Sequence, residues 1–331
     1  MSNPEPQYHY DWADLAFGSK KPLRELRATF IAAPRELSEK RFKELVKTYL
    51  PKGNIVLGIS KEAFVEGFEG QLQFKMLERA DVQTVINKVN HSQKSPHRIY
   101  TLRYYQRELP YILDKVSFLQ VLFIRGSWQY SFHTLPIYYT LTSKDIPYEM
   151  VSPFVDEAEA KMYESTLFEQ RSKRILETRF DILSETGMLA AADTIATYSY
   201  DYSFQTGVVL GVKVPDAPDK YTFLQGAYNK VVPYETYALH HGSSREEHFS
   251  PPNDLNHYDA VHAEMELLVF ALERKLDLKD TTLFINLLPC PSCARTLSQT
   301  SIKEVIYRID HSDGYAVKIL EATGKLVRRV V

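Results

Sequence analysis

The amino-acid sequence predicts an α/β protein built from two domains. Three observations lead to this fold class. The chain has 331 residues, which is long enough for two domains. Its hydrophobic content of 44% and charged content of 25% are typical of a globular protein. Buried β-prone runs alternate with helical patterns. A charge-rich, helix-prone stretch follows residue 156, so we place the boundary near 165 and expect domains 1–165 and 166–331.

The first domain is expected to alternate strands and helices. Its first 25 residues are polar and aromatic, which indicates an extended arm. The β-prone runs are 28–33, 54–59, 98–102 and 118–124, and the helical patterns are 35–50, 61–90 and 103–115. This alternation favours a parallel, Rossmann-like sheet. No GxxxxGKS or GxGxxG pattern is present, so nucleoside triphosphate hydrolysis has no support.

One stretch of this domain is a candidate ligand site. It runs from Arg125 to His133, directly after a buried strand, where open α/β sheets bind their ligands. Arg125 and His133 could hold an anion, and Trp128 could stack on a base. A packed aromatic loop is the alternative interpretation.

The second domain is expected to contain a hairpin, several further strands and four helices. The expected strands are 206–213, 221–227, 281–288, 304–309 and 326–331, and the expected helices are 182–196, 264–275, 293–298 and 315–323. Turn-forming residues 215–219 join the first two strands into the hairpin. A long polar insertion, 234–256, precedes the third strand.

The second domain also carries two short motifs, His262-Ala263-Glu264 and Pro289-Cys290-Pro291-Ser292-Cys293. A catalytic zinc ion takes three protein ligands and leaves one position for water. His262, Cys290 and Cys293 supply an imidazole and two thiolates, while Glu264 can reach the water without binding the metal. The two cysteines lie three residues apart at a helix start, so they share one face and are favoured as thiolates. A redox pair, a structural zinc site and an inactive copy are the alternatives, and the intact glutamate argues against the last.

From about residue 180 to its end, the chain resembles the cytidine deaminase-like superfamily, and within it the deoxycytidylate deaminase branch. Both motifs are similar to the signature of zinc nucleobase deaminases. The runs 206–210 and Gly226-Ala227-Tyr228-Asn229 are similar to the family's first two strands. The resemblance implies a three-layer α/β/α domain with a five-stranded mixed sheet, and Zn²⁺ as cofactor. It also implies hydrolytic deamination of a cytosine nucleotide, with dCMP favoured.

The resemblance further implies a role for individual residues. Zinc-bound hydroxide attacks the ring carbon that carries the amine, and Glu264 shuttles the proton. The backbone of Ala263 hydrogen-bonds the ring, and Asn229 holds the nucleoside. A phosphate needs a cation, for which we expect Arg245, with Lys230 and Arg295 as other candidates; a solvated surface role is the alternative for each.

Met265-Glu266-Leu267 replaces the asparagine-containing continuation of the branch and leaves the exact substrate open. An alternative is deamination of a base in RNA or DNA, which tyrosines 198, 200 and 202 and the basic early helix would favour. Another is a nucleotide-sensing binding protein on a deaminase scaffold. Histidines 240, 241, 248 and 257 could form a second metal site, although a mobile loop is the default interpretation.

Composition adds expectations about partners and compartment. The net charge of −2 does not indicate nucleic acid as a partner, and no apolar run approaches the roughly 20 residues of a membrane span. We therefore expect a small nucleotide as substrate and no membrane contact. Both cysteines belong to the motif and the first residues lack signal-peptide features, so we expect a cytoplasmic protein. Because folds of this kind commonly pair through their helices, we expect a homo-oligomer.

Overall fold

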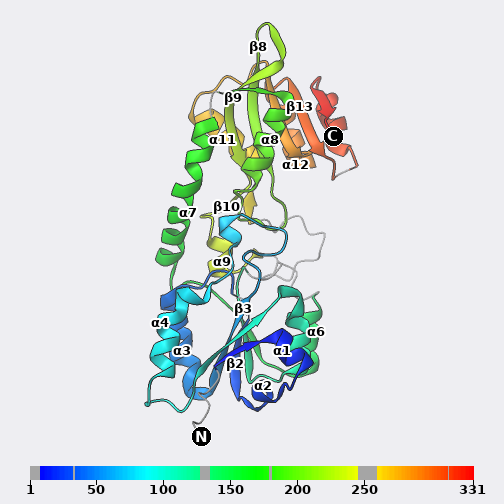
Figure 1. Cartoon of the computed structure of the whole chain (residues 1–331). Helices are drawn as coiled ribbons and strands as arrows, with labels where there is room; N and C mark the ends of the chain where they lie inside the picture. The colour runs from blue at the N-terminus through cyan, green and yellow to red at the C-terminus, as the bar shows by residue number, and fades with distance from the viewer. Residues whose placement is uncertain (1–7, 33, 127–134, 179–180, 245–258, 312) are drawn as a thin grey trace. The chain divides into compact units, whose positions relative to one another are not determined.

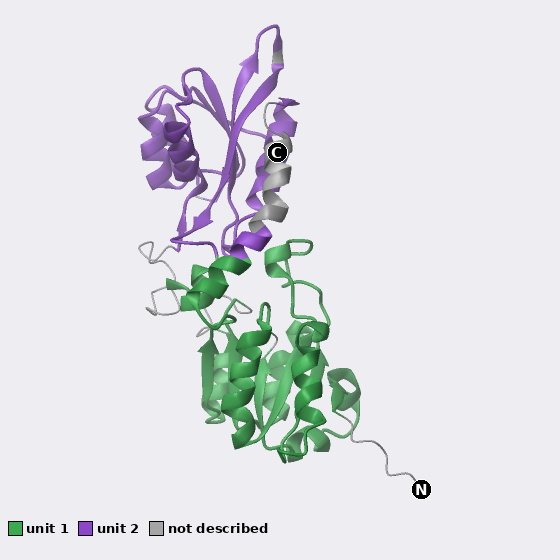
Figure 2. Cartoon of the chain, turned by 90° about the vertical axis from the view of Figure 1, so that its left-hand side faces the viewer, with its two compact units in different colours: residues 1–163, 236–257 green, residues 164–235, 258–331 purple. Residues whose placement is uncertain are grey.

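The computed structural model describes residues 8–32, 34–126, 135–178, 181–244, 259–311 and 313–331, with the side chains of 168–178 and 218 not described. The chain divides into two compact units (Figure 2). Unit 1 comprises residues 1–163 and 236–257, and unit 2 comprises residues 164–235 and 258–331. The segment from residue 236, which we expected in the second domain, therefore groups with unit 1. Both units are α/β folds, and none of the described helices has the length and apolar character needed to span a membrane.

In its described part, unit 1 contains one six-stranded sheet in which every pairing is parallel. The strand order is β1-β4-β3-β2-β5-β6. Because the strands are parallel, their carboxyl ends share one edge of the sheet. The strands are β1 (His9–Asp11), β2 (Ala28–Ala32), β3 (Asn54–Ser60), β4 (Ile99–Tyr104), β5 (Gln120–Ile124) and β6 (Tyr148–Val151).

Helices cover both faces of this sheet (Figure 1). Successive strand residues point to opposite faces, so Phe30 joins one core and Ile31 the other. The first face carries α1 (Trp12–Phe17), α2 (Lys21–Glu25), α5 (Leu109–Lys115) and α6 (Pro136–Ser143), and the second carries α3 (Glu39–Tyr49) and α4 (Arg79–Asn90). Short 3-10 turns lie at η1 (Leu50–Lys52), η2 (Leu72–Phe74) and η3 (Gln106–Glu108).

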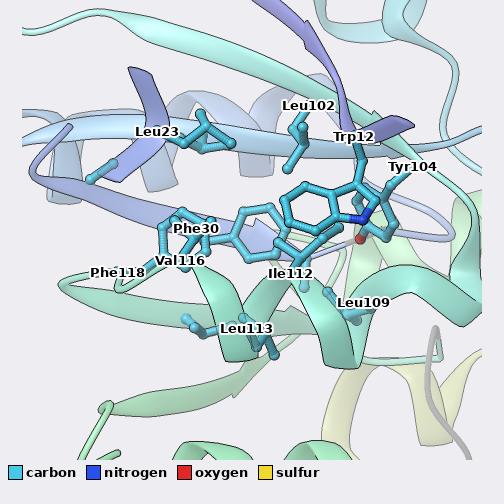
Figure 3. Packing of buried hydrophobic residues seen from close by; sticks show 14 of the residues in the cluster. Trp12, Leu23, Phe30, Leu102, Tyr104, Leu109, Ile112, Leu113, Val116 and Phe118 are labelled. Carbon is cyan, nitrogen blue, oxygen red and sulfur yellow. The ribbon is translucent and has the colours of Figure 1, made fainter. Parts of the chain in front are cut away.

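The expected extended arm is wrong for the residues described there, because residues 9–25 form β1, α1 and α2. The Asp11 side chain caps α1 by accepting a hydrogen bond from the Ala13 amide at 2.9 Å. Trp12 is only 4% exposed and packs with Leu23 and Phe30 in the first core (Figure 3). Burial of this large apolar side chain stabilises the segment against the sheet.

A second expectation for this unit also needs correction. The helical pattern at 61–90 forms a helix only from Arg79, where α4 begins. Residues 61–78 form turns and η2 instead, and Phe64 makes an isolated bridge with Lys75.

Unit 2 is built on a mixed sheet with the order β14-β13-β12-β8-β9-β7. The first three strands run parallel, and β8, β9 and β7 are joined by antiparallel pairings. The strands are β7 (Ile182–Ser184), β8 (Gly207–Val214), β9 (Ala217–Tyr228), β12 (Thr281–Leu287), β13 (Glu304–Ile309) and β14 (Leu326–Arg329). The expected hairpin is therefore present as β8 and β9.

The expectation of five strands is corrected to six for the described residues, because Ile182–Ser184 adds a strand beside β9. We had placed these residues in a helix. That helix, α8 (Glu185–Ala196), begins only after Ser184, whose side chain caps it by accepting from the Gly187 amide at 3.1 Å. The serine ends the strand and starts the helix at the same position.

Helices lie on both faces of this sheet, so unit 2 has three layers. Helix α8 packs on one face, and α11 (Ala263–Glu273), α12 (Pro291–Ser298) and α13 (Tyr315–Glu321) pack on the other. Alternation along β12 shows the arrangement. Leu283 and Ile285 pack in one core with residues of α11, α12 and α13, whereas Phe284 packs in the other core with residues of α8. The remaining elements are the pair β10 (Lys230–Val231) and β11 (Ala260–Val261), the long helix α7 (Glu157–Thr178) and the short helix α9 (Tyr237–His241).

Candidate functional site

His262 stands between a short strand and a helix. Strand β11 pairs with β10, with Val261 opposite Lys230, and this ladder leads the chain directly into His262. His262 is the N-cap residue of α11, with an extended backbone at φ −66° and ψ 147°. Its side chain therefore lies at the start of the helix, and Glu264 follows in the first turn.

Cys290 stands at an equivalent position on the next strand and helix. Strand β12 ends at Leu287, and the Leu288 amide donates to the Ile309 carbonyl at 2.7 Å. Cys290 is the N-cap residue of α12, and Pro291 occupies the first turn, where a missing N–H costs nothing. The Cys293 amide donates to the Cys290 sulfur at 3.4 Å, which brings both cysteines to one helix end.

The structure brings the three expected ligands together. The ligand atoms of His262, Cys290 and Cys293 all lie within 4.8 Å of one another. His262 Nδ1 is 3.5 Å from the Cys290 sulfur and 3.3 Å from the Cys293 sulfur. In a tetrahedral zinc site, Zn–N and Zn–S bonds of roughly 2.0 and 2.3 Å set a nitrogen and a sulfur ligand about 3.5 Å apart. The donor types and their spacing therefore fit zinc.

The two thiols shift each other's pKa in opposite directions. A hydrogen bond from the Cys293 thiol, supported by His262, lowers the pKa of Cys290 to about 4. The same hydrogen bond, together with burial, raises the pKa of Cys293. The pKa of His262 is raised by its hydrogen bond to Cys290. Zinc binds thiolates, so a cation held here would require both sulfurs to be deprotonated.

Glu264 lies beside this group and is almost fully buried, with 2% of its surface exposed. Burial raises the pKa of its carboxyl group to about 7, although His262 acts against the shift. A carboxyl group that titrates near neutral pH can both accept and donate a proton. Ala263 precedes it and is fully buried, and its position at the start of α11 leaves its amide without an acceptor inside the helix.

Asn229 follows β9 and holds the loop of residues 199–206. It is 5% exposed. Its Oδ1 accepts from the Thr206 amide at 2.8 Å, and its Nδ2 donates to the Phe204 carbonyl at 2.8 Å and to Asp201 Oδ2 at 3.2 Å. Asp201, in this loop, is the smallest of the causes that raise the pKa of His262, after Cys290 and Glu264. The structure thus shows Asn229 as an anchor of this loop.

A second loop anchor, Asn286, was missed by sequence reasoning. It lies in β12, where Asn286 Oδ1 accepts from the Gly207 amide at 2.9 Å and its Nδ2 donates to the Gln205 carbonyl at 3.0 Å. A polar residue near the end of a β-prone run was the only signal available. Gly207 is required at this point, because a Cβ there would lie 2.0 Å from the Ala192 carbonyl of α8.

The structure describes only some of the residues that we expected to bind a phosphate. Arg245 lies outside the described residues, as do His248, His257 and the stretch 127–134. Lys230 is half-buried in β10. Burial raises the pKa of Glu266, and Lys230 acts against that shift. Arg295 is exposed on α12. Within the described parts of the chain, the His262 group is the single cluster suited to a metal ion.

Comparison with known proteins confirms the resemblance for the region around the motifs. Residues 224–309 match the family model of the cytidine and deoxycytidylate deaminase zinc-binding region. Both motifs and Asn229 lie inside the matched range.

The individual proteins to which this chain is similar include deoxycytidylate deaminases of two phages. The chain is 29% identical over 92 residues to the deoxycytidylate deaminase of Enterobacteria phage T2, covering 27% of this chain and 46% of the relative. It is 31% identical over 61 residues to that of Enterobacteria phage T4, covering 18% and 32%. The chain thus spans less than half the length of these relatives. A solved dCMP deaminase of cyanophage S-TIM5 with dCMP and dUMP is 18% identical, with coverage of 43% and 93% and a TM-score of 0.32.

Proposed function

We propose that this chain is a zinc-dependent hydrolytic deaminase of a free cytosine nucleotide, with dCMP as the favoured substrate. The observation that carries the proposal is the group of His262, Cys290 and Cys293 with Glu264 buried beside it. The matched zinc-binding region and the similarity to phage deoxycytidylate deaminases support it.

His262, Cys290 and Cys293 would hold the zinc ion. When bound there, zinc supplies the Lewis acidity that makes water nucleophilic near neutral pH. The remaining chemistry is proton transfer, and Glu264 has the position and the pKa for it. It would take one proton from the attacking water and pass it to the ring nitrogen, and then take the second proton from the hydroxyl group added to the ring carbon and deliver it to the departing amine. One water is consumed, one ammonia is released, and the amine is replaced by a carbonyl group.

Other residues of the chain would position the substrate. The Ala263 amide at the start of α11 is available to hydrogen-bond the pyrimidine ring. Asn229 would contact the nucleoside while it holds the loop 199–206. We keep Arg245 as the proposed phosphate partner. Lys230 is a second candidate, and both residues precede the His262 motif in the sequence.

A free nucleotide is favoured over a base in RNA or DNA. Base stacking requires exposed aromatic rings, but Tyr198 is 8% exposed and Tyr200 is 5% exposed, which leaves only Tyr202 of the three partly exposed. The basic early helix α3 carries ion pairs, with Lys43 on Glu39 at 2.5 Å and Arg41 on Glu44 at 3.1 Å. A nucleotide-sensing scaffold without activity is disfavoured by the intact Glu264.

The remaining expectations are kept as proposals. We keep the division into a Rossmann-like domain, 1–165, and a catalytic domain, 166–331; a unit boundary between residues 163 and 164 supports it, whereas residues 236–257 group with the first unit. We also keep a homo-oligomeric assembly and a cytoplasmic location as predictions. Sedimentation of the purified chain and imaging of a tagged copy test them.

The function is tested with the zinc-loaded full chain and a panel of substrates. The panel contains dCMP, CMP, deoxycytidine, AMP and a cytosine-containing single-stranded oligonucleotide, and released ammonia is measured. We expect dCMP to show the highest kcat/KM and the oligonucleotide to release none. Deamination of the oligonucleotide without any mononucleotide would favour the nucleic-acid alternative. No ammonia from any compound would favour the scaffold.

A further inference from the structure

Phe204 is the one exposed residue of the loop 199–206, whose residues the structure describes throughout. It is 52% exposed, whereas the other residues of the loop are buried or half-buried. Single apolar residues are common on protein surfaces, so this exposure alone indicates no function. The backbone around Phe204 and the place of its loop give the exposure a meaning.

The backbone of Phe204 is held on both sides. Its amide donates to Asp201 Oδ1 at 3.3 Å, and its carbonyl accepts from Asn229 Nδ2 at 2.8 Å. The next carbonyl, that of Gln205, accepts from Asn286 Nδ2 at 3.0 Å. The loop therefore presents the ring on a fixed backbone, and ordering the ring against a ligand costs little conformational entropy.

The residues that hold Phe204 lie beside the proposed metal ligands. Asn229 precedes β10 and His262 follows β11, so both lie at the same end of this antiparallel pair. Asp201 is among the causes that raise the pKa of His262, so its carboxylate acts on that ring. Asn286 lies in β12, the strand that leads to Cys290. The exposed ring is thus anchored to the surroundings of the metal group through its own main chain.

The hydrogen bonds of Asn229 leave a task for another side chain. The amide of Asn229 has two N–H groups, and the loop uses both, on the Phe204 carbonyl and on Asp201 Oδ2 at 3.2 Å. Toward a substrate, Asn229 can therefore offer only the remaining acceptor capacity of Oδ1. A hydrogen-bond acceptor does not bind the flat face of a base, whereas an aromatic ring does.

We propose that Phe204 stacks on the pyrimidine ring of the substrate and holds the base beside the metal group. This inference rests on the proposed function, because it requires a nucleotide bound at His262, Cys290 and Cys293. Stacking favours any planar base over a sugar phosphate that lacks one, since every base has a π face. The choice among bases would then depend on hydrogen bonds to the ring edge, such as the one proposed for the Ala263 amide.

Calorimetric titration of the zinc-loaded full chain with dUMP tests the proposal. As the product of the proposed reaction, dUMP binds without being consumed. We expect Phe204→Ala to raise the Kd for dUMP about tenfold, which lies within the range for base–aromatic stacking. Phe204→Trp, which keeps an aromatic face, should restore the affinity. In turnover of dCMP, Phe204→Ala should raise KM more than it lowers kcat.

Leu326→Ala is the matched control for loss of an exposed apolar side chain. Leu326 is 54% exposed and begins β14. Because β14 and β12 both run parallel to β13, this residue lies at the edge of the sheet opposite the end that leads to Cys290. Its Kd for dUMP should be unchanged. The urea midpoint of Phe204→Ala should also be unchanged, since a half-exposed ring contributes little packing.

The outcomes separate this inference from the proposed function. Unchanged affinity for dUMP in Phe204→Ala, in a chain that deaminates dCMP, overturns the stacking role and leaves the proposed function standing. A loss of affinity that Phe204→Trp does not restore, or that comes with a lower urea midpoint, overturns it as well, because a structural role then explains the loss. If the unaltered zinc-loaded chain neither binds dUMP nor deaminates any mononucleotide, the proposed function fails and this inference fails with it.

Discussion

Replacing Asn229 with alanine should destabilise unit 2 even in the absence of substrate. The amide makes three hydrogen bonds to the loop 199–206, at 2.8 Å to the Thr206 amide, 2.8 Å to the Phe204 carbonyl and 3.2 Å to Asp201. Each such bond contributes roughly 0.5–1.5 kcal/mol, and Asn229 is buried, so the free energy of unfolding should fall by about 2–4 kcal/mol. Urea titration followed by circular dichroism measures this change.

Asn286→Ala is the matched control, because Asn286 makes two hydrogen bonds to the same region, with Gly207 and Gln205. Its loss should cost about 1–3 kcal/mol. If Asn229 also holds the nucleoside, kcat/KM should fall about tenfold further in Asn229→Ala than in Asn286→Ala. A loss of stability below about 0.5 kcal/mol in Asn229→Ala would refute the loop-anchoring argument. Equal losses of kcat/KM would limit Asn229 to a positioning role.

Three further predictions concern the metal, the pH dependence and the N-terminal segment. Cys290→Ser should lose tightly bound zinc, measured by metal analysis, and lower the melting temperature of the zinc-loaded chain; full zinc occupancy would contradict the ligand assignment. Burial acts on Glu304, but Arg328 at 2.8 Å and Lys213 outweigh it and lower its pKa below the usual 4.5. The stability that Glu304 contributes is therefore present above pH 4.5 and lost as the pH falls through the folded pKa. Glu304→Gln should reduce the free energy of unfolding at pH 7 and flatten the acid side of the stability–pH profile. An unchanged acid side would contradict this prediction. Trp12→Ala should cost about 3–5 kcal/mol of unit 1 stability in a urea titration, whereas an extended, unpacked arm predicts almost none.

The proposed metal ligands could be predicted because their signal is local. The cysteines are three residues apart at one helix start, and His262 caps another helix, so sequence spacing alone places each half of the group. The meeting of the two halves depends on β12 and α11 packing in one core, which the sequence indicated only through the resemblance to a three-layer domain.

The features that were missed depend on distant contacts. Trp12 is buried in a core that it shares with residues of α5 and β2, which lie far from it in the sequence. The position of α9 depends on a leucine meeting a glycine far away in the sequence, Leu239 on Gly126. The loop anchors Asn229 and Asn286 act through backbone groups of residues 204–207, which carry no sequence pattern.

Steady-state turnover of dCMP by the Glu264→Gln variant, with zinc content measured on the same sample, tests the central claim most directly. Glutamine keeps the shape of the side chain but cannot carry the proton. Glu273→Gln, on an exposed position at the end of the same helix, is the matched control. We predict full zinc occupancy in both variants, normal turnover in the control, and at least about a 10²-fold fall in kcat for Glu264→Gln. Normal ammonia release by zinc-loaded Glu264→Gln would contradict the account.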